Sequence, residues 1–145
     1  MHPPHRGSLL VDHELRELIG SALLRGPDGA PIEPAQLQPA SLDLRLAGKA
    51  YRLRAGFLPG KTSVARRLER LAVEEISLEG AGGVLQRGAV YLIPLQEELA
   101  LPSSLRARFN PRSSTGRCDI FTRVLCEGHP RFDEAPPGYH GRLML

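Results

Sequence analysis

Apolar and polar residues alternate along several short stretches of this chain, with glycine and proline between them. In the run 42–46, three leucines alternate with Asp43 and Arg45, which is the pattern of a strand with one buried face. A second alternating run covers 51–55. Further short apolar runs are found at 76–78, 84–85, 90–93, 105–109, 120–125 and 143–145. Many short strands separated by turns predict an all-β sandwich or distorted barrel.

Two segments have helical spacing instead. Asp12 is a candidate N-cap for a short amphipathic helix that runs to Ile19. Thr62 is a candidate cap for a second short helix within 62–73, with arginines on its outer side. That arginine face is interpreted either as a solvated surface or as a contact with a subunit or nucleotide. The segment 25–34, which is rich in glycine and proline, predicts a surface loop.

Size and composition narrow the possible classes. With 145 residues, of which 41% are hydrophobic, residues 1–145 are expected to form one domain. A net charge of +3, no tryptophan and 5% aromatics do not favour nucleic-acid binding. The sequence has no run of the roughly 18 apolar residues that a membrane helix needs, and residues 1–5 do not resemble a signal peptide. Cys118 and Cys126 are the only cysteines, so we expect a reducing, cytoplasmic location.

The richest chemistry lies in residues 110–117, where two arginines bracket two serines, a threonine and a glycine. Guanidinium groups bind phosphate in bidentate fashion, hydroxyls add hydrogen bonds, and glycine lets backbone N–H groups approach an anion. A second tight turn follows at 138–141, with Tyr139 and a histidine between two glycines. Together these two motifs predict a nucleotide pocket, with phosphates at the first and the base or sugar near the second.

These motifs resemble those of the dCTP deaminase branch of the dUTPase-like superfamily. The run 38–46 is similar to the opening strand signature of that family, and 119–124 to the strand after its arginine–serine motif. The resemblance extends from about Leu9 to the last residue, and it is greatest to the long, two-repeat bacterial form. It implies a β-clip fold, like a distorted jelly roll. It also implies that residues 1–145 are most of a first repeat, ending before its last strands.

The resemblance assigns roles to individual residues. It implies that Ser113 and Arg117 lie near the attacking water and the base, as catalytic groups. Arg131 and Asp133 would face the sugar and base, or alternatively form surface ion pairs, and Tyr139 would pack under the sugar or in the core. The expected nucleotide-binding residues are therefore Arg112, Ser113, Ser114, Thr115, Gly116, Arg117, Arg131, Asp133 and Tyr139. His129 and His140 are expected to be solvated.

The resemblance places the catalytic glutamate, the general base, just past Leu145, the last residue of this chain. Glu127 and Glu134 are expected in loops and do not match the family position. We therefore expect residues 1–145 to be part of a longer protein, and to be inactive alone. The reaction implied is hydrolytic deamination of dCTP to dUTP and ammonia.

Zinc is not expected, because His13 adjoins Glu14 and the two cysteines do not have the spacing of zinc-deaminase ligands. Magnesium is expected only on the triphosphate. Two alternatives stay open: a dUTP diphosphatase or bifunctional deaminase–diphosphatase, and a nucleotide-binding or assembly module without catalysis. The resemblance also implies a homo-oligomer of trimer type.

Overall fold

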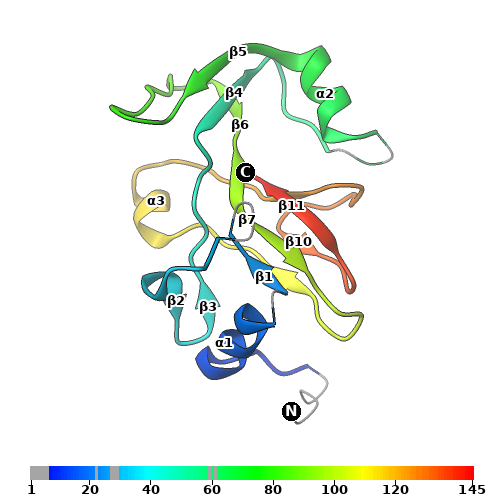
Figure 1. Cartoon of the computed structure of the whole chain (residues 1–145). Coiled ribbons are helices and arrows are strands. Elements are labelled where there is room, and N and C mark those ends of the chain that lie inside the picture. Colours follow the sequence, from blue (N-terminus) through cyan, green and yellow to red (C-terminus); the bar gives the residue numbers. More distant parts are fainter. Residues whose placement is uncertain (1–6, 22, 27–29, 59, 61) are drawn as a thin grey trace.

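The computed structural model describes residues 7–21, 23–26, 30–58, 60 and 62–145. Within them, short antiparallel strands dominate and the helices are few and short, which confirms the predicted all-β class (Figure 1). Residues 1–5 and part of the predicted surface loop, 27–29, lie outside the described residues. The elements are α1 (Asp12–Gly20), β1 (Leu24–Arg25), the 3₁₀ turn η2 (Pro34–Gln36), β2 (Leu37–Gln38), β3 (Ser41–Leu42), β4 (Lys49–Leu53), α2 (Val64–Leu71), β5 (Ala72–Ser77), β6 (Val90–Leu92), β7 (Pro94–Ala100), β8 (Ala107–Arg108), α3 (Ser113–Arg117), β9 (Leu125–Cys126), β10 (Glu134–Ala135) and β11 (His140–Met144).

The larger sheet has the strand order β1-β7-β11-β9, and all of its pairings are antiparallel. Leu99 of β7 lies between Leu24 of β1 and Gly141 of β11. Leucines from these strands pack with Leu18 of α1 and with the buried Tyr139 to form the main core. Two small antiparallel strand pairs, β2-β3 and β8-β10, complete this half of the molecule.

A second sheet, β5-β4-β6, forms with α2 the upper part of the molecule in Figure 1. Its core contains Leu53, Val64 and Leu92, together with Leu125 from β9 of the larger sheet. The two sheets are therefore joined through shared apolar packing rather than through a linker.

The helix boundaries differ slightly from those predicted. Helix α1 is preceded by Val11 as its N-cap residue, so Asp12 is its first helical residue and not its cap. Helix α2 is capped by Ser63, whose hydroxyl accepts a hydrogen bond from the Arg66 N–H (3.3 Å), and not by Thr62. It ends at Leu71, where the chain passes directly into β5.

Strand β7 was not predicted, although at seven residues it is the longest strand described. Leu95, Glu97 and Leu99 point inward, and the residues between them are half-buried. An acidic residue at an inward position interrupts the apolar alternation, which explains why the sequence pattern missed the strand.

The predicted strand at 42–46 is wrong for most of its length. Regular pairing ends at Leu42, and beyond it only an isolated bridge joins Leu46 to Leu95. The backbone of Asp43 and Arg45 is hydrogen-bonded to Gln36 and Glu97 side chains as well as to other backbone groups, so it does not need a strand partner on each side.

Most of the other strand predictions are correct in place but not in extent, and the one at 84–85 is wrong. Residues 84–85 belong to an exposed connection between β5 and β6 and form no strand. The expected strand at 105–109 is limited to β8, and that at 120–125 begins only at Leu125. The last strand, β11, starts earlier than predicted, at His140. Leu145 exchanges two backbone hydrogen bonds with Ile93, both of 2.8 Å.

Candidate functional site

The arginine–serine motif forms the short helix α3. Arg112 is its N-cap residue in an extended conformation, and the Arg112 carbonyl accepts hydrogen bonds from Thr115 N–H (3.0 Å) and Gly116 N–H (3.2 Å). Ser113, Ser114 and Arg117 are exposed on this single turn. These hydroxyl and guanidinium groups are thus accessible to solvent.

An ion pair connects this helix to the segment 38–46. Arg112 Nη1 lies 3.7 Å from Asp43 Oδ2, and the same carboxylate oxygen accepts a hydrogen bond from Gln38 Nε2 (3.3 Å). The segment 38–46 and the motif 112–117 therefore meet in space, although about seventy residues separate them in the chain. Arg117, by contrast, has no ion pair within the part of the chain that the structure describes, so its charge is available to a ligand.

The segment that carries Arg131 and Asp133 lies beside the approach to α3. Strand β10 pairs with β8, and Phe109 N–H donates to the Asp133 carbonyl (3.0 Å), just before the chain enters the motif. Asp133 has a φ of +62° and its Oδ1 accepts the Val124 N–H (2.9 Å). The structure thus pairs the segment around Asp133 with the strand that precedes the motif, and not with the motif itself.

Arg131 and Asp133 do not pair with each other. Asp133 forms an ion pair with Arg123, whose guanidinium also lies 5.7 Å from the centre of the Phe132 ring. Arg131 Nη1 lies 3.3 Å from Glu134 Oε1. Both are engaged in surface ion pairs, the alternative considered for them, and contact with a nucleotide stays a prediction for each.

Neither of the two acids near the site stands free in the geometry of a general base. Glu134 lies in strand β10, not in the expected loop, and the hydrogen bond with His129 (3.2 Å) together with the charge of Arg131 lowers its pKa. His129 is therefore largely covered rather than solvated, with 17% of its side chain exposed. Glu127 follows β9 in a turn, and its Oε1 accepts the N–H of Val64 (2.9 Å), the first residue of α2.

Tyr139 is buried in the main core. Its hydroxyl donates to the Arg142 carbonyl (2.6 Å) and accepts from Glu127 N–H (3.1 Å). Gly141 has a φ of +149°, and a Cβ there would come 3.1 Å from the tyrosine hydroxyl. The glycine thus lets the ring fold back over its own turn, and core packing explains the Gly-Tyr-His-Gly pattern; a contact of Tyr139 with a sugar stays a prediction.

Burial raises the pKa of Tyr139 to about 12 and that of the adjacent core thiol of Cys126 also to about 12. Both groups keep their protons in the folded protein at a pH where the unfolded chain has lost them. Unfolding at high pH therefore releases protons. We expect the contribution of these two groups to the free energy of unfolding to be fully present below about pH 9 and to be lost progressively as the pH rises toward 12. Thermal unfolding midpoints at pH 8, 9.5 and 11 measure this.

The two cysteines offer a matched pair for that measurement. Cys126→Ala removes the buried thiol and should make the alkaline decline shallower, whereas Cys118→Ala alters an exposed thiol and should leave the decline as in the wild type. Equal slopes for all three proteins would contradict the assignment to Cys126.

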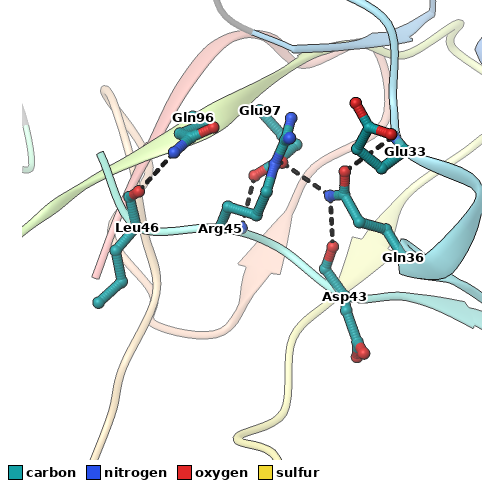
Figure 2. Close-up of polar contacts among 7 residues, drawn as sticks. All are labelled: Glu33, Gln36, Asp43, Arg45, Leu46, Gln96 and Glu97. Atoms are coloured by element: carbon teal, nitrogen blue, oxygen red, sulfur yellow. Dashed lines mark hydrogen bonds and ion pairs between the residues drawn. The ribbon is translucent and has the colours of Figure 1, made fainter. Parts of the chain in front are cut away.

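A buried polar cluster was missed by the sequence analysis. Glu97 is fully buried, and its carboxylate accepts hydrogen bonds from Arg45 N–H, Arg45 Nε and Gln36 Nε2, each at 2.8 Å (Figure 2). Gln36 Nε2 also donates to the Asp43 carbonyl (2.8 Å). Because these residues come from segments far apart in the chain, no local pattern indicates the cluster.

The residues of the motif line neither of the two hollows described for this structure, a larger one and a smaller one beside α1. The larger hollow, of about 490 Å³, lies between the start of β4 and the β5–β6 connection, where it is lined by Leu46, Leu78 and Leu85 among others, and no residue of α3 contributes to it. Within the described residues there is no group of three or more His, Cys, Asp or Glu side chains arranged to hold a metal ion. Likewise, no helix in the described part is long and apolar enough to cross a membrane.

Comparison with known proteins gives consistent similarities. Residues 6–145 match the family described as the 2'-deoxycytidine 5'-triphosphate deaminase N-terminal domain. The chain is 32% identical over 141 residues to "dCTP deaminase, dUMP-forming" of Coprothermobacter proteolyticus, covering 94% of this chain and 68% of that protein. It is 31% identical over 118 residues to "dCTP deaminase" of Haloarcula marismortui, covering 76% of this chain and 54% of that protein.

A solved structure shares the fold. The crystal structure of 2'-deoxycytidine 5'-triphosphate deaminase from Agrobacterium tumefaciens has a TM-score of 0.86 and 48% sequence identity, over 93% of this chain and 40% of that one. The resemblance expected from the motifs is therefore confirmed, as is the dUTPase-like fold. The chain spans less than half of that solved chain and about two thirds of several curated relatives.

Proposed function

Since the chain belongs to the family of the dCTP deaminase N-terminal domain, we propose that it takes part in the hydrolytic deamination of dCTP to dUTP and ammonia. In this reaction water adds to C4 of cytosine, its protons pass with the help of a base to ring N3 and to the amino group, the C4–N bond breaks, and the amino group leaves as ammonia. The protein has to bind the triphosphate and hold the cytosine ring next to an activated water.

One observation carries the proposal: the Arg112–Asp43 ion pair joins the opening strand signature to the arginine–serine helix. Around this junction, the exposed groups of α3 are those that recognise phosphate. We assign Arg112, Ser114, Thr115 and Gly116 to the phosphates. We assign Ser113 and Arg117 to the water and the cytosine ring, and Arg131 and Asp133 to the sugar and base.

The general base is proposed to be a glutamate just past Leu145, in continuation of β11. Glu127 accepts a hydrogen bond from the N-terminus of α2, and Glu134 pairs with His129 and Arg131. These contacts support placing the general base elsewhere. Without it, general-base catalysis worth ~10²–10⁴-fold is lost. A polypeptide of residues 1–145 alone is accordingly expected to release no measurable ammonia from dCTP.

The experiment is to incubate the complete protein with dCTP and magnesium, and to quantify ammonia, dUTP, dUMP and pyrophosphate. Ammonia with dUTP supports the simple deaminase. Ammonia with dUMP and pyrophosphate supports a bifunctional deaminase–diphosphatase, the second candidate, which the name "dUMP-forming" of several relatives favours. Tight dCTP binding without ammonia would replace both by the non-catalytic nucleotide-binding module.

The remaining features follow from the same proposal. Magnesium would be carried by the triphosphate. Most residues of the motif are exposed, which supports a site completed by other parts of a longer, two-repeat protein or by neighbouring subunits in a trimer-type homo-oligomer. A nucleotide-metabolising enzyme of this kind would work in the cytoplasm.

A further inference from the structure

Stability alone does not explain why an acidic residue, Glu97, stands at a fully buried position. It lies on the inward row of β7 between Leu95 and Leu99, where a leucine would continue the apolar face. Exchanging a buried ion pair for apolar residues is often neutral or stabilising, whereas removing one partner alone is strongly destabilising. The charge is therefore better explained by what its hydrogen bonds hold in place.

Those hydrogen bonds hold the irregular segment 43–46. Glu97 fixes Arg45 by its backbone N–H and by its Nε, and Gln96 N–H donates to the Arg45 carbonyl (2.9 Å). Glu97 also orients the side chain of Gln36, whose Nε2 donates to the Asp43 carbonyl. The backbone carbonyl of Gln36 in turn accepts a hydrogen bond from the Asp43 N–H (2.8 Å). The backbone of Asp43 is thus held at both its N–H and its carbonyl.

The side chain of Asp43 points from this fixed segment toward α3, where its carboxylate lies 3.7 Å from Arg112 Nη1. Arg112 is otherwise exposed, with 72% of its side chain accessible. A long, exposed arginine loses rotamer entropy when it binds a ligand, and a fixed counter-charge restricts its positions beforehand. The chain of contacts from Glu97 through Arg45 and Gln36 to Asp43 therefore ends at a proposed phosphate ligand.

We propose that Glu97 is a positioning residue: through Arg45, Gln36 and Asp43 it holds the Arg112 guanidinium in place for the triphosphate, without touching the nucleotide. This inference rests on the proposed function of the arginine–serine helix. It predicts that Glu97 affects the affinity for the phosphates and not the chemical step at the cytosine ring.

The test compares Glu97→Gln with Glu98→Gln in the complete protein. Glu98 is the next residue on β7 but faces outward, in ion pairs with Arg142 (2.8 Å) and Arg25 (3.5 Å). Glu97→Gln should raise KM for dCTP about two- to fivefold, the range for one exposed ion pair, with kcat unchanged within about twofold. Glu98→Gln should leave both constants unchanged.

A double-mutant cycle distinguishes positioning from general damage to the fold. In an Arg112→Ala background, Glu97→Gln should change KM no further, because the path ends at Arg112. Asp43→Asn breaks the same path without altering a buried group, and it should reproduce the rise in KM even if Glu97→Gln does not fold. Independent, multiplicative effects in the cycle, or an unchanged or lower KM in Asp43→Asn, would overturn the proposal.

A ligand-free measurement separates failure of this inference from failure of the proposed function. If the wild-type protein neither binds nor converts dCTP, the proposed function is wrong. The position of Arg112 can then still be followed by the NMR signal of its Nε–H. That signal should shift in Glu97→Gln and in Asp43→Asn but not in Glu98→Gln; an unchanged signal in the first two would show that Glu97 does not position Arg112.

Discussion

Replacement of Arg117 by alanine should lower kcat/KM for dCTP by ~10²–10³-fold in the complete protein, the effect of removing one preorganised donor from a reaction centre. Arg117 lies in the last turn of α3, is exposed, and has no ion pair among the residues that the structure describes. Its positive charge is therefore not already neutralised, and it can stabilise negative charge that develops on the ring or the attacking water. Steady-state kinetics of ammonia release measures the loss.

Helix α2 supplies a matched control. Arg70 is also an exposed arginine in the last turn of a short helix, but it belongs to the second sheet's layer and not to the motif. Arg70→Ala should leave kcat/KM within about twofold of the wild type, as expected for a surface substitution. Equal losses in both variants would indicate an effect of net charge, and wild-type activity in Arg117→Ala would refute its catalytic assignment.

Replacement of Leu143 by alanine should lower the free energy of unfolding by ~2–5 kcal/mol, because it leaves a cavity in the main core. Leu143 is fully buried in β11, between β7 and β9, where its register partner is Cys126. For a protein of this size the thermal midpoint of the transition should fall by roughly 5 to 15 °C. Differential scanning calorimetry of the complete protein measures it.

Val84→Ala is the control for that substitution. Val84 is 85% exposed in the β5–β6 connection, so losing its methyl groups should change the free energy of unfolding by less than about 0.5 kcal/mol. A small effect at Leu143, similar to that at Val84, would mean that the centre of the larger sheet is not packed as described.

Local sequence patterns predicted the class of fold well where one face of a strand is apolar. The alternation at 51–55 predicted β4, and the runs at 90–93 and 143–145 lie largely in or directly beside β6 and β11. The pattern failed at β7, where Glu97 takes an inward position, and at 43–46, where side chains replace strand partners. Both failures have one cause, which is a polar cluster built from segments distant in the chain.

For the site, the order of chemistry-bearing residues was sufficient to predict the family to which the chain belongs, while phosphate binding by the arginine–serine motif stays a prediction. It was not sufficient for the pairing of charges. The sequence indicated no partner for Arg131 or Asp133, whereas in the structure Arg131 contacts Glu134 and Asp133 contacts Arg123. The positive φ of Asp133 and the β8-β10 pairing set these directions, and neither is visible in local spacing.

The amino-acid sequence by itself thus determined the all-β class, the two glycines around Tyr139 and the composition of the arginine–serine motif, because each depends on residue type and short-range periodicity. Only the tertiary structure decided that Tyr139 packs in the core, that Asp43 meets Arg112, and that Glu97 is buried behind them. Buried charges must find partners wherever the fold places them, and those partners lie tens of residues away in the chain.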